Sequence, residues 1–323
     1  MPLNVSREIL QQNRILESIK SQSVKKLLSE FKKMGEAAEK ARKAAREAGG
    51  IDKLEEEERK KLEKWNQFVS QFNRPMKEGL FSDFANKDDI AEIVRFKSTA
   101  PEGTDEENGN IHWTSFADYV QRMKPDQKAI YYITGTDEKT LRSSPLLEAY
   151  KKKGFEVLIM ADDIDDLVIP GLGKYKDYDL KSVNRAGSDE ELGVDKEEAE
   201  KKEQEFKPIV EKIKNALGER VKDVHLSKRL ADSPSCIVVD EDDPSLQMER
   251  MMRAMGRTGF GEVKPILEVN GDHPIVASLK DCDDADYIED LSNVLLDQAL
   301  LVDGAELKNP ADFVNRLNRL IKR

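Results

Sequence analysis

Apolar residues recur every three to four positions over the first part of the chain, from Ser6 to about Met34. This spacing is typical of an amphipathic helix, in which one side faces a core and the other faces water. The polar triplet SQS at 21–23 interrupts the pattern and is a candidate break between two helices. The chain is therefore expected to open with helical structure.

The following stretch, 35–64, is dominated by Ala, Glu, Lys and Arg and contains a break at Gly49 and Gly50. A charge-rich run of this kind usually forms the solvated face of a helix, and we expect no binding role for it. Apolar helical spacing returns at 65–72. We expect this last helix to end near Pro75, because proline removes a backbone hydrogen-bond donor.

A different pattern begins at 129–135, where AIYYITG is a continuous apolar run rich in β-branched and aromatic residues. A short amphipathic helix is expected at 145–154, closed by Gly154, and a second apolar strand at 155–162. Strand, helix and strand at this spacing predict a βαβ unit with a right-handed crossover. Only one glycine follows the first strand, so the unit lacks a glycine-rich phosphate-binding loop.

The acidic, lysine-rich segment 187–206 contains few large apolar residues, and we place a domain boundary near residue 188. Beyond it the pattern predicts a helix at about 197–217 and strands in VKDVHLS, SCIVVD and KPILEVN. A methionine-bearing helix lies between the last two strands, and two helices follow them.

These patterns together predict the fold classes α/β and α+β. The expected order is a helical segment (1–85), a small three-layer α/β subdomain (86–187), and a mixed α+β domain (188–323) that ends in a helix hairpin.

The methionine-bearing helix lies in the sequence DDPSLQMERMMRAMG, where Asp243 can cap it, Pro244 suits its first position and Gly256 suits its end. Its methionines fall on one helical face, at positions Met248, Met251, Met252 and Met255. An ordinary core stripe has this spacing. However, the flexible methionine side chain also suits a surface that accepts many apolar partners, so both interpretations stay open.

The segment YIEDLSNVLLDQALLVDG (287–304) carries more apolar residues than one helix face can hold. Its main stripe consists of Ile288, Leu291, Leu295, Ala299 and Val302. The last helix, 309–323, has an apolar face that includes Phe313, Leu317 and Leu320. The surplus predicts a helix hairpin that pairs with a second copy in a four-helix bundle. The alternative is a hairpin folded entirely onto its own domain.

The amino-acid composition argues against nucleic acid and membranes as partners. Charged residues make up 36% of the 323 residues, and the formal net charge is −11. Such a charge argues against non-specific binding to nucleic acid or to an anionic membrane. No apolar run approaches the roughly 18 residues that span a bilayer, and no signal-peptide pattern is present, so a cytoplasmic protein is expected.

Catalytic and metal motifs are scarce. Cys236 and Cys282 stand apart from each other and from the scattered histidines, which predicts reduced thiols and no metal site, although a single disulfide is an alternative. GxSxG and HExxH motifs do not occur in the sequence. The pattern indicates a binding and oligomerisation protein rather than a complete enzyme.

One feature near the start stands out, because NVSREIL (4–10) begins a helix near Ser6 and places Arg7 in its first turn. A cation there faces the positive end of the helix dipole, where an anion is favoured. Arg7 therefore either points into water or faces a phosphate group together with free backbone N–H groups. The local sequence leaves both possibilities open.

Six segments, in their order along the chain, resemble the heat-shock-protein-90 (Hsp90) chaperone family and in particular its bacterial type. They are PLNVSREILQ, MKEGLFSDFANKD, YVQRMKPDQKAIYYITG, SSPLLEAYKKKGFEVLIMADDIDD, ALGERVKDVHLSKRL and LLDQALL. The resemblance covers nearly the whole chain except 35–60, which looks like an insertion. The family has an N-terminal ATP-binding domain, a middle domain and a C-terminal dimerisation domain. The resemblance implies a fragment that contains part of the middle domain (1–187) and the dimerisation domain (188–323), with the N-terminal ATPase domain missing.

The resemblance also gives Arg7 an expected role. The matching arginine of the family reaches the γ-phosphate of ATP, and the glutamine on the same helical face matches Gln11. The full-length protein is thus expected to be an ATPase that binds ATP and Mg²⁺. The fragment alone is expected to bind neither of them and to hydrolyse no ATP.

The remaining implications concern partners. Unfolded client proteins are expected to bind the methionine face, with a contribution from Asp166 and Leu167, where Leu167 stands at a position that is often aromatic in the family. The last two helices are expected to form a homodimer. The ending LIKR lacks the acidic peptide of eukaryotic members, which implies a bacterial or organellar member. The expected function is part of an ATP-dependent molecular chaperone, and the alternative is a structural dimerisation scaffold without client binding.

Overall fold

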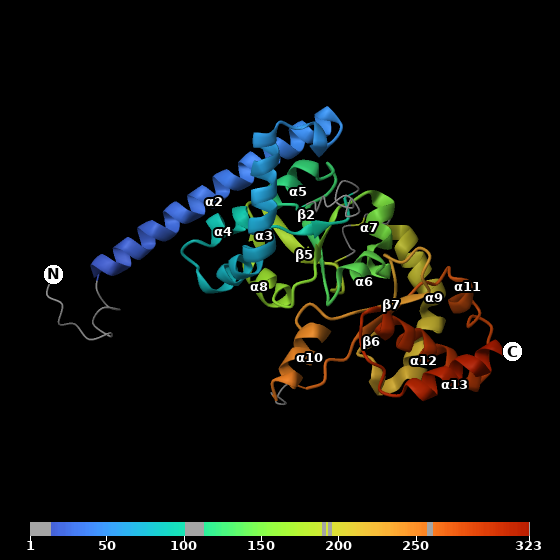
Figure 1. Ribbon diagram of the computed structural model, residues 1–323. Helices are drawn as coiled ribbons and strands as arrows, with labels where there is room; N and C mark the ends of the chain where they lie inside the picture. Colours follow the sequence, from blue (N-terminus) through green and yellow to red (C-terminus); the bar gives the residue numbers. More distant parts are fainter. Residues whose placement is uncertain (1–13, 101–112, 189–191, 193–195, 257–260, 323) are drawn as a thin grey trace. The chain divides into compact units, whose positions relative to one another are not determined.

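The computed structural model describes residues 14–100, 113–188, 192, 196–256 and 261–322. The chain forms two compact units, which are described separately (Figure 1). The first unit contains residues 1–95 and 105–118, and the second contains residues 96–104 and 119–323.

The first unit is helical, as its periodicity predicts. Its elements are α2 (Arg14–Ala48), η1 (Ile51–Lys53), α3 (Glu56–Ser82) and α4 (Lys87–Ile93). α2 ends at the predicted glycine pair, where Gly49 has a positive φ of 80°, and the chain then turns back into α3. Small alanines on α2 and the large Trp65 on α3 are buried in the core of this unit.

Two predicted helix ends in this unit are wrong. α2 continues without interruption through the triplet 21–23, because serine and glutamine cost a helix only tenths of a kcal/mol per residue. α3 also continues through Pro75, although proline inside a helix is costly. Residues on both sides of Pro75 are buried, and the amide of Asn73 exchanges two hydrogen bonds of 2.8 Å with the backbone of Arg95. This packing keeps the helix intact beyond the proline.

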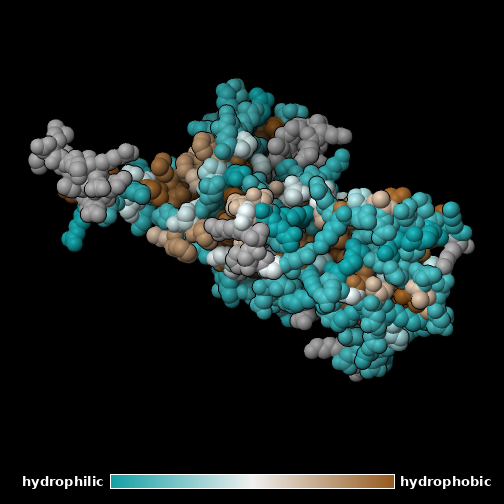
Figure 2. Space-filling view, turned by 90° about the horizontal axis from the view of Figure 1, so that it is seen from below, coloured by the Kyte–Doolittle hydropathy of each residue, from teal (hydrophilic) through white to brown (hydrophobic). Residues whose placement is uncertain are grey.

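Residues 14–27 of α2 include no buried residue and carry the exposed apolar residues Ile15, Ile19 and Leu27. Figure 2 shows hydrophobic side chains among the hydrophilic surface of the described residues. From Leu28 onward, by contrast, α2 has buried residues.

The second unit contains two mixed sheets. The first sheet has the strand order β1-β3-β2-β5-β4, with parallel pairing of β2 with β3 and of β2 with β5. Its strands are β1 (Lys97–Ser98), β2 (Ala129–Thr134), β3 (Val157–Met160), β4 (Lys174–Tyr175) and β5 (Tyr178–Ser182). The predicted parallel βαβ unit is therefore confirmed, with every residue of β2 and β3 buried.

Short helices accompany this sheet. They are α5 (Phe116–Arg122), α6 (Glu138–Arg142), η3 (Pro145–Leu147), α7 (Glu148–Lys153) and α8 (Asp165–Leu172). The predicted helix at 145–154 is thus a 3₁₀ turn followed by α7, and Gly154 ends it with a φ of 67° as expected.

The second sheet has the order β6-β8-β7, formed by β6 (Asp223–Leu226), β7 (Ser235–Val238) and β8 (Ile266–Val269). The helices of this part are α9 (Lys196–Leu217), η5 (Gly218–Arg220), α10 (Leu246–Ala254), α11 (Pro274–Ala277), α12 (Ala285–Val302) and α13 (Pro310–Ile321). α12 and α13 contact each other, as the predicted hairpin requires. The expectation of mixed α/β structure with a C-terminal helix pair is confirmed.

Residues on both sides of the expected boundary near residue 188 belong to the second unit and share one hydrophobic cluster, which includes Val183, Leu192 and Val238. The backbone of Val239 donates to the carbonyl of Asn184 and accepts from the amide of Ala186, so β7 is tied to the end of β5. The division at residue 188 stays a prediction.

A buried polar cluster strengthens the same junction. Arg229, in the loop between β6 and β7, is completely buried and forms an ion pair of 2.9 Å with Glu268 on β8. Its guanidinium also donates to the carbonyl of Val183 and to the hydroxyl of Ser188, at 2.7 and 3.1 Å. One arginine thereby joins the end of the first sheet to the second sheet.

A carboxylate forms a second link between these parts. Glu148, at the start of α7, accepts hydrogen bonds from the backbone amides of Ala231, Asp232 and Ser233 and from the Ser233 hydroxyl. Partial burial opposes ionisation, but these hydrogen bonds lower the pKa of Glu148 below its ordinary value. The loop before β7 is therefore held by an ionised side chain.

Candidate functional site

α10 carries the methionine stripe and begins two positions later than the sequence predicts. The hydroxyl of Ser245 accepts from the backbone amide of Met248 at 3.0 Å, which makes Ser245 the N-cap. The predicted cap, Asp243, and the predicted first residue, Pro244, lie in the preceding loop. Serine is among the residues preferred at a helix N-cap, so Ser245 was a capping signal visible in the sequence.

None of the residues of α10 is buried. Met251 is 41% exposed and Met255, directly after the helix, is 62% exposed. Met248 and Met252 are half-buried. No methionine of the stripe is therefore buried in the core of the domain, and Met251 and Met255 are accessible. A binding role for the stripe stays a prediction.

The loop that leads into α10 is held by two cations. Arg185, just after β5, donates to the backbone carbonyls of Asp240 and Asp243. Lys222, just before β6, lies 2.8 Å from a carboxylate oxygen of each of the same two aspartates. The hydrogen bond from Lys222 lowers the pKa of Asp240 and raises that of the lysine itself. These contacts fix where the helix starts.

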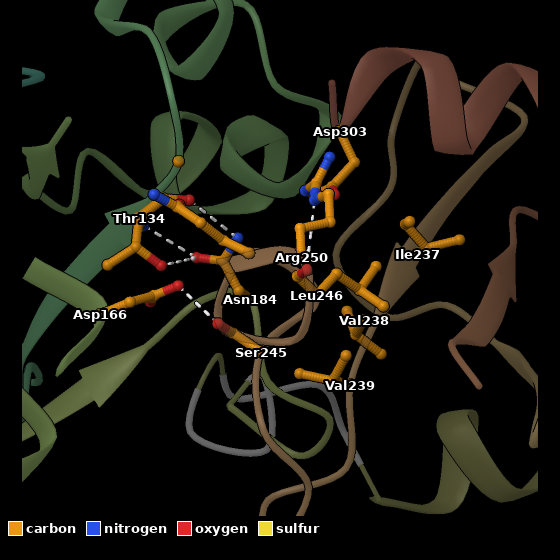
Figure 3. A pocket seen from close by; sticks show the side chains of 12 residues that line it. Thr134, Asp166, Asn184, Ile237, Val238, Val239, Ser245, Leu246, Arg250 and Asp303 are labelled. Atoms are coloured by element: carbon orange, nitrogen blue, oxygen red, sulfur yellow. Dashed lines mark hydrogen bonds and ion pairs between the residues drawn. The ribbon is translucent and has the colours of Figure 1, made fainter. Parts of the chain in front are cut away.

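α8 contacts α10 and carries the other two predicted client residues, of which Asp166 lies close to Ser245 (Figure 3). A carboxylate oxygen of Asp166 accepts a hydrogen bond of 2.5 Å from the hydroxyl of Ser245. Leu167, the next residue, is 42% exposed. Asp166 therefore holds the N-terminus of α10, while Leu167 adds an apolar side chain to the accessible surface.

A small hollow of about 30 Å³ lies beneath α10, which is room for one or two water molecules. Its polar lining includes Thr134, Asn184, Asp166, Arg250 and Asp303 (Figure 3). Burial raises the pKa of Asp303 to about 6, and the nearby Arg250 opposes this rise.

The main apolar stripe of α12 serves the core of its own domain. Leu291, Leu295 and Ala299 are buried in one cluster with residues of α9 and β8, and Ile288 packs against this cluster. A second copy has no access to the three buried side chains while the domain is folded. This part of the predicted dimer stripe therefore points inward.

The exposed apolar residues of the hairpin lie elsewhere, at the end of α12 and along α13. Leu301 and Val302 are exposed on the former, and Val314 and Ile321 on the latter, where Ile321 is 73% exposed. Of the other predicted residues, Val302 belongs to this exposed group, whereas Phe313, Leu317 and Leu320 are half-buried. α13 has no buried residue, and polar contacts hold it on α12.

A carboxylate on α12 determines that position. Arg319 of α13 donates from two nitrogens to the two oxygens of Asp290, each at 2.6 Å. Arg316 lies 3.2 Å from the same carboxylate. Asp290 is largely buried, so this charged contact locks the hairpin, while Val314 and Ile321 of α13 stay exposed.

Arg7 and Gln11 lie outside the residues that the structure describes. Within the described part of the chain, no cluster of three His, Cys, Asp or Glu side chains has the arrangement of a metal site. No helix in that part is long and apolar enough to cross a membrane.

Comparison with known proteins identifies the family of this chain. The family model described as "Hsp90 protein" matches residues 1–323. A chaperone protein HtpG of Treponema denticola is 62% identical over 99% of this chain and 46% of its own length. The HtpG of Treponema pallidum is 50% identical over 100% of this chain and 46% of its own length. That of Wolinella succinogenes is 42% identical over 100% of this chain and 47% of its own length. The chain thus spans about half the length of the curated relatives it matches.

Proposed function

The chain belongs to the Hsp90 family and is of the bacterial HtpG type, and on this premise we propose that it binds unfolded or partly folded client proteins. The observation that carries the proposal is the accessible methionine face of α10, which contacts the helix α8 that carries the exposed Leu167. The surface is apolar, adaptable and held in place by polar contacts at the start of the helix.

Methionine suits this task for a physical reason. Its unbranched side chain has three rotatable bonds and a polarisable sulfur, so one surface can pack against many apolar sequences. Exposed apolar side chains in a contiguous group mark interaction sites on folded proteins. Met251, Met255 and Leu167 are all more than two-fifths exposed, and each is available to a client.

Replacing Met251 and Met255 together with glutamine tests client binding. Glutamine keeps the length of the side chain and a similar helix propensity, so the helix is expected to persist. We expect suppression of the aggregation of heat-denatured citrate synthase to weaken several-fold, while the melting temperature of the variant stays within about 2 °C of the unchanged protein.

The matched control replaces Phe81 and Phe84 with glutamine, because both are exposed apolar residues of the first unit, far along the sequence from α10. This control is expected to retain suppression. Equal suppression by the methionine variant and the unchanged protein contradicts the assignment. A large fall in melting temperature contradicts the exposed position of the methionines.

The same premise supports association of two copies through the α12–α13 hairpin. Leu301, Val302, Val314 and Ile321 form an unpaired apolar group on a hairpin that Asp290 holds rigid. Two such hairpins packed around a two-fold axis give a four-helix bundle and cover this group. A structural dimerisation scaffold without client binding is the competing function, and it predicts a dimer that suppresses no aggregation.

Nucleotide chemistry belongs to the longer proteins. We propose that ATP and Mg²⁺ are bound by a part of the relatives' length that lies outside this chain. Arg7 then contributes a positive charge toward the γ-phosphate of ATP, and Gln11 helps to position the loop.

In a full-length protein, Arg7→Ala is expected to lower the ATP turnover number about tenfold or more with little change in the affinity for ATP, because an arginine finger acts on the transition state. Steady-state hydrolysis and nucleotide titration measure the two quantities. Equal turnover with and without Arg7 contradicts the role.

A further inference from the structure

α10 is a nine-residue helix without a single buried side chain, which raises the question of what holds it in place. Helices of this length are not stable alone in water. Leu246 packs partly against the domain core, and the other anchors are polar. At the N-terminus Ser245 is bonded to Asp166 of α8, and one turn further Arg250 reaches the connection between α12 and α13.

Arg250 bonds to two elements at once. Its Nε donates to the carbonyl of Leu246 within α10, at 3.1 Å. Its Nη1 donates to the carbonyl of Gly304 at 2.9 Å, and its Nη2 lies 3.3 Å from a carboxylate oxygen of Asp303 (Figure 3). The planar guanidinium fixes the relative orientation of the groups that it joins.

The acceptors are residues that set the course of the hairpin. Asp303 is the C-cap of α12, and Gly304 has a φ of 83°, a left-handed conformation that glycine adopts without strain. These residues directly follow Leu301 and Val302, the exposed apolar side chains at the end of α12. The turn that leads from α12 into α13 is therefore bonded to the methionine helix.

We propose that Arg250 couples the methionine face to the helix hairpin, so that a client on α10 strengthens the association of two copies. This coupling rests on the proposed function. A client that packs on Met251 and Met255 stabilises α10 in its docked position, and docked α10 holds the turn at Asp303 and Gly304. Because coupling free energies are reciprocal, association of the hairpins strengthens client binding by the same factor.

A neighbouring residue provides a matched control. Arg253 lies one turn further along α10 and pairs at 2.7 Å with Glu249 of the same helix. Replacing it removes an arginine from α10 without touching the contacts to Asp303 and Gly304. Arg250→Gln and Arg253→Gln therefore change the charge equally and differ in the link to the hairpin.

The test measures the dissociation constant of the dimer by sedimentation equilibrium, with and without saturating reduced carboxymethylated α-lactalbumin as a permanently unfolded probe. We expect the probe to tighten the dimer of the unchanged chain about 5- to 20-fold, within the usual range of coupling between sites. The shift is expected to fall below about twofold in Arg250→Gln and to persist in Arg253→Gln. Asp303→Asn, which keeps the size of the side chain, is expected to reduce the shift as well.

The possible outcomes separate the two proposals. A full shift in Arg250→Gln, or no shift in the unchanged chain although the probe binds and the chain dimerises, overturns the coupling alone. Failure of the probe to bind overturns the proposed client binding and the coupling with it. Circular dichroism shows whether each variant is folded. If Arg250→Gln and Asp303→Asn both lose the probe-induced change in the dissociation constant and are both unfolded, the coupling role is overturned as well.

Discussion

Arg229→Met is expected to lower the free energy of unfolding of the second unit by about 3–5 kcal/mol, the usual cost of removing one partner of a buried ion pair. Arg229 is completely buried, and its partner Glu268 is 4% exposed. Without the guanidinium, the carboxylate of Glu268 stays in the interior without its countercharge. The carbonyl of Val183 and the hydroxyl of Ser188 lose a donor at the same time.

Denaturant unfolding followed by far-ultraviolet circular dichroism measures this effect. The double variant Arg229→Met with Glu268→Met is expected to recover a large part of the loss, because two apolar side chains of similar length leave no uncompensated charge. Lys280→Met breaks the solvent-exposed pair with Glu205 and is expected to leave the midpoint unchanged. A single variant as stable as the unchanged chain is the result that contradicts the importance of the cluster.

Val314→Asp combined with Ile321→Asp is expected to raise the dissociation constant of the dimer at least a hundredfold. Each apolar side chain contributes about 1.5–3 kcal/mol when it is fully buried, and the two-fold axis makes each substitution count twice. Both residues are exposed in the single chain, at 49% and 73%, so their replacement is expected to spare the fold. Sedimentation equilibrium at micromolar concentration gives the mass directly.

Phe84→Asp is the control for this experiment, because Phe84 is an exposed aromatic of the first unit and does not belong to the hairpin. It is expected to stay dimeric. Leu295→Asp provides a contrast, since Leu295 is buried in its own domain and the variant is expected to lose thermal stability together with the dimer. A monomeric mass for the unchanged chain at micromolar concentration contradicts the proposed interface.

Most secondary structure could be predicted because the spacing of apolar residues is a local property. The β2 and β3 runs are apolar at every position, as in buried parallel strands, and the structure places strands there. The failures at 21–23 and at Pro75 have different causes. The polar residues at 21–23 cost a helix too little to break it. At Pro75, packing partners such as Arg95, which lies far along the sequence from Asn73, outweighed a local preference.

The candidate site was predictable only in part. The methionine stripe was visible, but its exposure depends on what the rest of the chain places against it. The stripe of α12 was predicted as a dimer interface but lies largely in the core of its own domain. Periodicity alone does not distinguish a domain's own core from an interface. The roles of Arg250 and Arg185 had no local signal, since their partners at Gly304 and Asp240 are more than fifty residues away in sequence.

The order of the second sheet affects how the chain folds during synthesis. β8 lies between β6 and β7 and pairs with both, yet it is made after both of them and after α10. At about 5–20 residues per second, the two earlier strands leave the ribosome seconds before their shared partner. Unpaired strand edges promote aggregation during this interval. A member of a chaperone family therefore passes through a stage in which its own nascent chain exposes the kind of surface that chaperones recognise.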